Sequence, residues 1–155
     1  SLGYETLLLS TFVEGEAREI ARVAAALGRS VLAHGDPVRP PACLVLGGET
    51  TVTVRGSGLG GRNQELALAA ALALEGLAGV SVMALATDGS DGPTDSSGAI
   101  VDGETATAIR VRGIDPVRAL LENDAYPALE AAGAQLHTGP TGTNVNDLLV
   151  VLVRA

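Results

Sequence analysis

The apolar positions of the chain fall into short continuous runs and into longer stretches where they recur at helical spacing. Short runs are typical of buried strands, and helical recurrence indicates helices with one packed face. The runs predict strands at 6–11, 42–46, 80–86, 134–137 and 148–153, and the polar-apolar alternation of 50–54 predicts one more. The recurrences predict helices at 14–32, 62–77, 104–112, 116–121 and 126–132. This order predicts an α/β fold, a layered mixed sheet with helices packed on it.

Two segments interrupt the pattern. Residues 36–41 are rich in proline, which removes hydrogen-bond donors and disfavours helix in the residue before it, so this segment predicts a stiff, extended linker. Residues 87–103 combine acids, glycines and hydroxyl side chains without a sustained period, which predicts one long loop. Loops of this length inside compact domains are usually functional.

Composition and charge narrow the range of functions. Eighteen acids against ten bases give a net charge of −8, the wrong sign for a protein that neutralises phosphates, so nucleic acids and anionic membranes are excluded as partners. All ten bases are arginine, so a step that needs a lysine must take it from elsewhere. Cys43 lies in an apolar run and predicts a small buried side chain. Because no apolar run approaches a membrane span and the first residues lack signal-peptide order, we expect a cytoplasmic protein.

The first candidate site is rich in glycine. Residues 47–51 lead through a predicted strand to 55–65, where glycines let backbone N–H groups converge and the next helix adds its positive N-terminal end. Arg62 stands where its guanidinium can clamp a phosphate or carboxylate with two hydrogen bonds. The segment therefore predicts an anion site. A flexible turn is an alternative. A dinucleotide site is another, since 56–61 matches G-x-G-x-x-G, although the acid that would bind the ribose is missing downstream.

The second candidate site is the acidic segment 87–98, which follows a predicted central strand. Its carboxylates, Asp88, Asp91 and Asp95, suit a magnesium ion or the orientation of a substrate hydroxyl. Their spacing excludes an EF-hand. The alternative is a pair of tight Asp-Gly turns with solvated acids.

The third candidate site is the polar segment 138–147. Its hydroxyls, amides and backbone donors suit phosphate oxygens or a polyhydroxy substrate, and Asp147 adds a metal ligand or base. A plain polar hairpin is the alternative. The two histidines, His34 and His137, have no partner at a recognisable spacing and are interpreted as structural.

At these segments the sequence resembles a known family. The motifs at 47–54, 60–65, 87–95 and 138–147, together with Asn123-Asp124, are similar to the MOFRL domain of class II glycerate 2-kinases. The resemblance implies that residues 1–38 are the tail of a preceding Rossmann-like domain and that residues 39–155 form the MOFRL domain.

The resemblance also implies an activity, which is phosphoryl transfer from ATP, with Mg²⁺, to the 2-hydroxyl of glycerate. It assigns Arg62 to phosphate or carboxylate binding, Asp88 to metal binding or hydroxyl orientation, and Asn144 to the substrate. Further substrate or phosphate contacts are implied at Glu49, Thr50, Gly60, Gly61, Asn63, Thr141 and Thr143, and metal contacts at Asp91 and Asp147.

The same family places its site in a cleft between this domain and an N-terminal domain that supplies a lysine. Phosphoryl transfer needs several groups at once, so we expect this chain alone to be inactive and the N-terminal domain to be its partner. Homodimer formation stays open. Two alternative functions also stay open, a hydroxypyruvate reductase, which is an older name for many family members, and a non-catalytic ligand-binding or assembly module.

Overall fold

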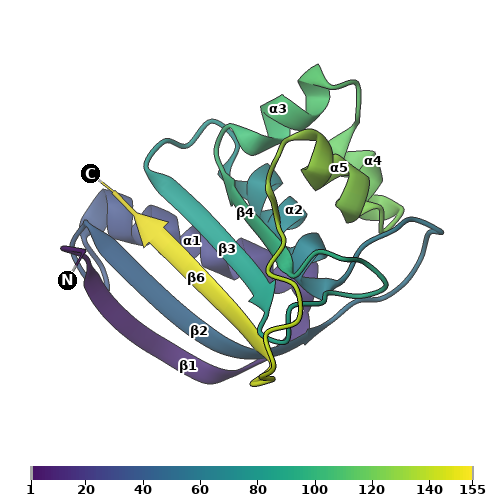
Figure 1. The fold of residues 1–155 in the computed structure, drawn as a ribbon. Coiled ribbons are helices and arrows are strands. Elements are labelled where there is room, and N and C mark those ends of the chain that lie inside the picture. The colour runs from purple at the N-terminus through teal and green to yellow at the C-terminus, as the bar shows by residue number, and fades with distance from the viewer. Residues whose placement is uncertain (1, 155) are drawn as a thin grey trace.

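The computed structural model describes residues 2–154 and contains one six-stranded sheet with helices packed on it (Figure 1). Its elements are β1 (Glu5–Glu16), α1 (Ala17–His34), β2 (Ala42–Thr51), α2 (Arg62–Leu74), β3 (Val80–Ala86), β4 (Gly98–Asp102), α3 (Thr105–Val111), α4 (Pro116–Leu121), α5 (Ala125–Ala131), β5 (Gln135–Leu136) and β6 (Asp147–Val153). The strand order is β1-β2-β6-β3-β4-β5. Only the β1–β2 pair among them is parallel, which confirms the mixed α/β sheet.

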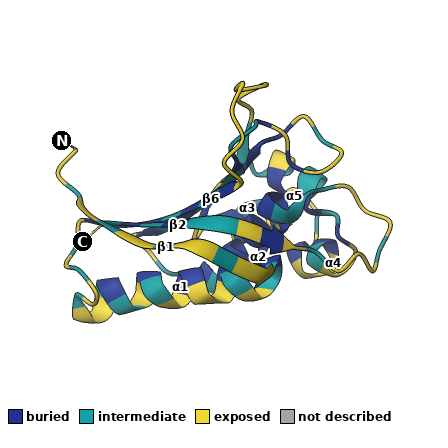
Figure 2. Cartoon of the chain, turned by 90° about the horizontal axis from the view of Figure 1, so that it is seen from below, coloured by how far each residue is buried: buried dark blue, intermediate teal, exposed yellow. Residues whose placement is uncertain are grey.

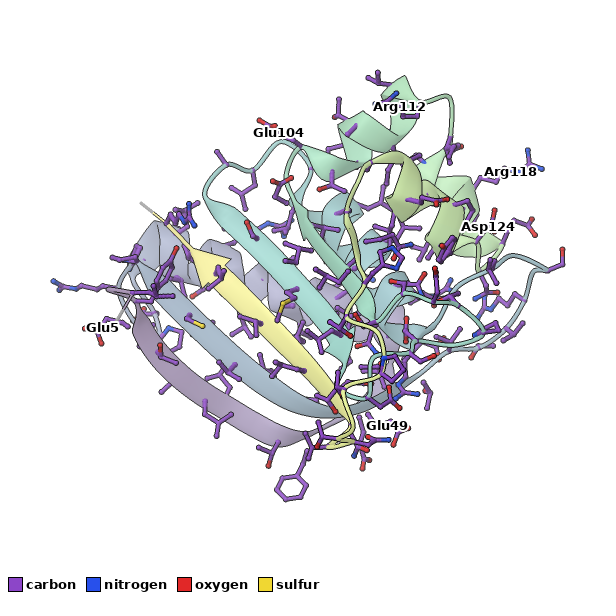
Figure 3. The ribbon with its side chains drawn as sticks, in the orientation of Figure 1. Glu5, Glu49, Glu104, Arg112, Arg118 and Asp124 are labelled. Carbon is purple, nitrogen blue, oxygen red and sulfur yellow. The ribbon has the colours of Figure 1, made fainter. Side chains whose placement is uncertain are left out.

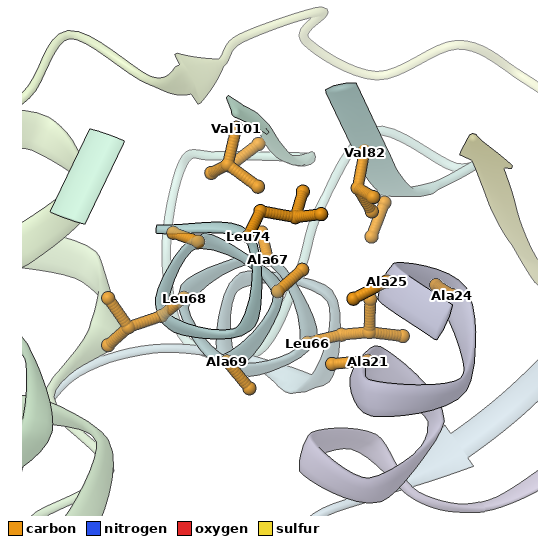
Figure 4. Packing of buried hydrophobic residues seen from close by; sticks show 14 of the residues in the cluster. Ala21, Ala24, Ala25, Leu66, Ala67, Leu68, Ala69, Leu74, Val82 and Val101 are labelled. Carbon is orange, nitrogen blue, oxygen red and sulfur yellow. The ribbon is translucent and has the colours of Figure 1, made fainter. Parts of the chain in front are cut away.

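The core lies between the sheet and two helices, α1 and α2, which cover the same face (Figure 2). Aliphatic side chains fill it, in agreement with the low aromatic content. Leu74 of α2 lies beneath Val82 and Val101, and Leu66 points toward Ala21 of α1 (Figure 4). The shorter helices α3, α4 and α5 pack against α2 beyond β4. Helix α2 is therefore apolar on nearly all sides because it is surrounded by protein.

Three of the differences from the expected boundaries come from pairing between strands. Strand β1 continues to Glu16, and α1 begins at Ala17 rather than at 14, because residues 13–16 pair with 48–51 of β2. The predicted strands 42–46 and 50–54 form one strand, β2, that ends at Thr51. The loop expected over 87–103 contains β4, which pairs with β3 and β5.

Two smaller expectations also change. Helix α2 ends at Leu74 rather than at 77. Cys43 is half-buried rather than buried, because its side chain lies on the sheet face opposite the helices.

Residues 5–34 share one sheet and one hydrophobic core with the rest of the chain. The division at 38/39 stays a prediction about the longer protein. Within residues 2–154, no helix is long and apolar enough to cross a membrane.

Candidate functional site

Arg62 begins α2 and is held by an acid from a distant strand. Its Nε donates to Oδ2 of Asp147 at 2.6 Å and its Nη2 donates to Oδ1 at 2.9 Å, while Nη1 lies 3.5 Å from Oε1 of Glu49. The hydrogen bond with Asp147 raises the pKa of Arg62, against the opposing effect of burial. Glu49 stands near the end of β2, at the end of the sheet from which β6 starts (Figure 3). The guanidinium is thus fixed in direction yet one-third exposed.

The side chain of Asp91 lies against the N-terminus of α2. The carboxylate is buried and accepts four hydrogen bonds, two from Asn63 on Oδ1 and two from Gln64 on Oδ2, at 2.9–3.1 Å. One bond to each oxygen comes from a backbone N–H, so Asp91 caps α2 from the 87–97 loop. A Cβ on Gly61 would lie 2.4 Å from this carboxylate, so only glycine allows the approach. Burial nevertheless raises the pKa of Asp91, because its hydrogen bonds offset the cost only in part.

Asn63 connects the two acids. Its Nδ2 donates to Oδ1 of Asp91 at 3.1 Å and to Oδ1 of Asp147 at 3.0 Å. Asn63 is buried, so it acts here as a positioning side chain between two carboxylates. Hydrogen bonds therefore link Asp91, Asn63, Asp147 and Arg62 in one continuous polar network.

The third polar segment is fastened to the end of β3. The Oγ1 of Thr87 donates to the carbonyl oxygen of Asn146 at 2.7 Å and accepts from the N–H of Val145 at 2.9 Å. Thr141 donates from Oγ1 to the Thr87 carbonyl at 2.5 Å. Asn144 Nδ2 donates to Oδ2 of Asp88 over a long 3.4 Å. Asp88, Thr141 and Asn144 are therefore brought together, as the sequence predicts for one site.

The remaining predicted residues lie at different depths. Thr143 is exposed, and its N–H donates to Oγ1 of Thr141. Thr50 is only 6% exposed, and its Oγ1 is the one buried side-chain polar atom without a partner in the described part of the chain. An open cavity of about 600 Å³ is lined by five of the predicted site residues, Glu49, Thr50, Gly60, Gly61 and Arg62. Its apolar wall includes Val52 and Pro93.

The G-x-G-x-x-G pattern does not form a dinucleotide turn. Its first glycine comes five residues after β2 ends rather than directly after the strand. A Cβ on Gly56 would lie 2.2 Å from the Glu122 carbonyl oxygen, and one on Gly58 would lie 2.4 Å from the Asp124 side chain. These glycines let the 52–61 loop pack on the α4–α5 connection.

The network that holds this loop includes none of the predicted site residues. Asn123 Oδ1 accepts from the N–H groups of Arg55 and Gly56 at 2.7 and 3.0 Å, and its Nδ2 donates to Oε2 of Glu65 at 2.8 Å. The buried carboxylate of Glu65 also pairs with Arg18 at 2.8 Å. Asn123 has a φ of 54°, a conformation that asparagine tolerates better than most residues. The Asn123-Asp124 pair in the sequence is a signal for such a turn.

The acids near the site do not form a metal centre by themselves. Within residues 2–154, no group of three or more His, Cys, Asp or Glu side chains is arranged to hold a metal ion. The oxygens of Asp91 and Asp147 are already used by N–H donors. Their metal role stays a prediction that this geometry does not favour.

The fold and the site define a family. The family model described as the MOFRL family matches residues 42–147, so the chain belongs to this family. The matched range includes Arg62, Asp88, Asn144 and Asp147.

Among individual proteins, the chain is 51% identical to the D-glycerate 2-kinase of Thermotoga maritima over 97% of this chain and 36% of that relative. A crystal structure of glycerate kinase from the same organism superposes with a TM-score of 0.95, covering 97% of this chain and 36% of that chain. The chain is also 44% identical to the glycerate 2-kinase of Pyrococcus horikoshii, over 98% of this chain and 34% of the relative. A putative hydroxypyruvate reductase of Agrobacterium vitis is 44% identical over 95% of this chain and 34% of its own length. The chain thus spans about a third of the relatives it matches.

Proposed function

We propose that this chain is the C-terminal part of a glycerate 2-kinase, a cytoplasmic enzyme that transfers a phosphoryl group from ATP to the 2-hydroxyl of glycerate. The observation that carries the proposal is the 51% identity to a D-glycerate 2-kinase over nearly the whole chain. The fixed, partly exposed Arg62 beside a cavity of about 600 Å³ supports it, because both substrates are anions.

In this reaction the covalent bonds form and break between the two substrates. The 2-hydroxyl oxygen of glycerate forms a bond to the γ-phosphorus, the bond from that phosphorus to the β,γ-bridging oxygen breaks, and ADP leaves. The hydroxyl proton passes to a base. Positioning and charge neutralisation therefore carry the catalysis.

In this proposal Arg62 binds a carboxylate or phosphate oxygen with the guanidinium N–H groups that Asp147 leaves free. Asp88 orients the hydroxyl, and Asn144, next to it, binds the substrate. Asp88 is half-buried and its carboxylate faces Asn144, so both side chains can reach one ligand. Thr141, another predicted contact, fastens the segment that carries Asn144 to Thr87.

Mg²⁺ belongs to the proposal through the family's chemistry and supplies charge neutralisation on the phosphates when bound. The acids of this chain do not fit a complete magnesium site, so the other ligands come from the nucleotide and from the rest of the longer polypeptide. The lysine that this chain lacks has the same external source.

The test is an assay of the longer polypeptide with ATP, Mg²⁺ and D-glycerate, in which ³¹P NMR follows formation of phosphoglycerate. Arg62→Lys keeps the charge but loses the two-pronged geometry, and we expect kcat/KM to fall by about 100-fold or more. Arg22→Lys is the matched control, because Arg22 is 73% exposed on α1 and pairs only with nearby Glu19 among the described ion pairs.

Residues 1–155 alone should show no turnover in this assay. Absence of phosphoglycerate from the longer polypeptide would refute the kinase proposal. Oxidation of NADH or NADPH with hydroxypyruvate would establish the reductase instead.

A further inference from the structure

Within residues 2–154, one face of the sheet has no helix packed on it. We call the side of the sheet opposite α1 and α2 the outer face; in Figure 2 the strands show it on the side away from α1. Along β6, Leu149, Val151 and Val153 are buried toward the helices. The alternate residues of β6, Leu148, Val150 and Leu152, point to the outer face and remain half-buried.

The register of the sheet lines up apolar side chains across five strands of the outer face. Leu8 of β1 pairs with Val45 of β2, and Val45 pairs with Val150 of β6. Val150 pairs with Met83 of β3, and Met83 pairs with Ile100 of β4. The two ends of this row are open, with Leu8 62% exposed and Ile100 45% exposed.

The row next to it on the side of the functional site is also apolar, whereas the row on the opposite side contains polar residues. On the site side, Leu148 pairs with Leu85 of β3. On the other side, Leu152 pairs with Cys43 and with Ser81, and Ser81 pairs with Asp102. The apolar part of the outer face therefore runs along β6 from Leu148, which directly follows Asp147, to Leu152, which pairs with Cys43.

A sheet with a solvent-facing side normally alternates apolar and polar residues along each strand. Strand β6 is instead apolar from Leu148 to Val153, a pattern typical of strands covered on both faces. Apolar patches of this kind mark surfaces that bind another protein layer.

We propose that the outer face docks apolar helices from the part of the longer polypeptide that lies outside residues 1–155. The relatives are about three times as long as this chain, so such a segment exists in them. A second copy is the weaker occupant, because each copy carries a net charge of −8 and the copies repel, whereas a tethered segment has a high local concentration.

The inference rests on the proposed function only in taking the chain as part of a longer protein. Since Leu148 follows Asp147 directly, the docked segment would lie beside the Arg62–Asp147 pair.

Cys43 is a built-in probe for this docking, because it is the single cysteine of the chain and lies half-buried on the outer face. Its rate of alkylation by a maleimide can be followed by mass spectrometry of the peptide that contains it. We expect ready labelling in residues 1–155 alone and labelling slower by about tenfold or more in the longer polypeptide. Light scattering should show the 155-residue chain to be monomeric.

Equal labelling rates in the two proteins would overturn the proposal. Protection in the 155-residue chain, together with a dimeric mass, would overturn it in favour of a second copy. Neither readout depends on catalysis, so a failure of docking and a failure of the kinase assignment are distinguishable.

Two variants sharpen the test. Val150→Glu places a charge at the centre of the row and should raise Cys43 labelling of the longer polypeptide to the rate of the chain alone. Leu8→Glu places the charge at the exposed edge, where folding tolerates it, and should raise the rate in the same direction if Val150→Glu does not fold. Unchanged protection in a folded variant at either position would contradict the docking.

Discussion

The side chains of the site owe their roles to neighbours rather than to their own chemistry. Asp91 resembles a metal ligand in sequence, but four N–H donors turn its carboxylate into a helix cap. Asp147 resembles a base, but its two oxygens bind Arg62. Both acids are less than a tenth exposed, so their hydrogen bonds are made in a medium where an unpaired charge is costly.

Asp91→Asn should lower the free energy of unfolding by about 1–3 kcal/mol. The amide group replaces one acceptor oxygen by a donor and sets it against the N–H groups of α2. Urea unfolding followed by circular dichroism measures the change. Glu14→Gln is the control, because Glu14 is an exposed acid, and it should leave stability within about 0.5 kcal/mol.

The same acid predicts a pH dependence. Burial raises the pKa of Asp91 above its ordinary value of 3.8, so the folded state binds this proton more tightly than the unfolded state. The stability of the wild type relative to Asp91→Asn should therefore decrease as pH rises from about 3.8 through the raised pKa. An increase over that range, in paired urea titrations, would contradict the sign.

Asp147 should act through Arg62. In the longer polypeptide, Asp147→Asn releases the guanidinium and should lower kcat by about tenfold or more, while the same change in an Arg62→Ala background should have little further effect. The half-saturating Mg²⁺ concentration should stay unchanged. If Asp147 is instead a metal ligand, that concentration will rise and the two changes will be additive.

Among the elements, α2 and the loop before it determine the shape of the site. The helix presents Arg62 at its first residue, and the 52–61 loop forms one wall of the cavity. The loop is held by Asn123 of the α4–α5 connection, and Asn123 is held by the buried Glu65 of α2. A residue between two short helices thus fixes a loop that follows β2.

Asn123→Ala should lower stability by about 2 kcal/mol or more, because it removes acceptors for two loop N–H groups and a donor to Glu65. It should also increase hydrogen exchange of the amides of residues 53–58 more than those of β3. Asp115→Ala is the comparison, since it removes the N-cap of α4 and should cost about 1 kcal/mol without effect on the loop. Equal exchange in the two variants would exclude the proposed role of Asn123.

At the scale of the whole molecule, the two faces of the sheet differ in what covers them. The inner face meets α1 and α2 and is closed. The outer face carries a row of aliphatic side chains across β1, β2, β6, β3 and β4 but no helix among the described residues. The chain therefore consists of a sheet with helices on one face, and its other face can pack against a further layer.

Val151→Asp should destabilise the 155-residue chain by more than about 3 kcal/mol, because it buries an unpaired carboxylate against the helices. Leu8→Asp, on the outer face, should cost much less. Thermal unfolding of the two variants measures the difference. Similar losses would mean that both faces are closed in the chain alone.

Much of the fold could be predicted from local pattern. Strand β6, strand β3 and the helices have strong hydrophobic periods, and the sequence located them within a few residues. Strand β4 was missed because its five residues follow an acidic, glycine-rich loop, and its strand character comes from pairing with β3. The extension of β1 to Glu16 was missed for the same reason, since β2 supplies its hydrogen bonds.

The sequence by itself determined the class of fold, the three polar segments and the arginine at the start of α2, because hydrophobic period and residue chemistry are local properties. The tertiary structure decided which of those polar residues face one another. Arg62 and Asp147 are 85 positions apart, and Asn63 and Asp91 are 28 apart, so their pairing depends on chain packing and on the loss of water around them. The same holds for the outer face, because a strand's period shows that two sides are apolar, and only the arrangement of helices shows which side is still uncovered.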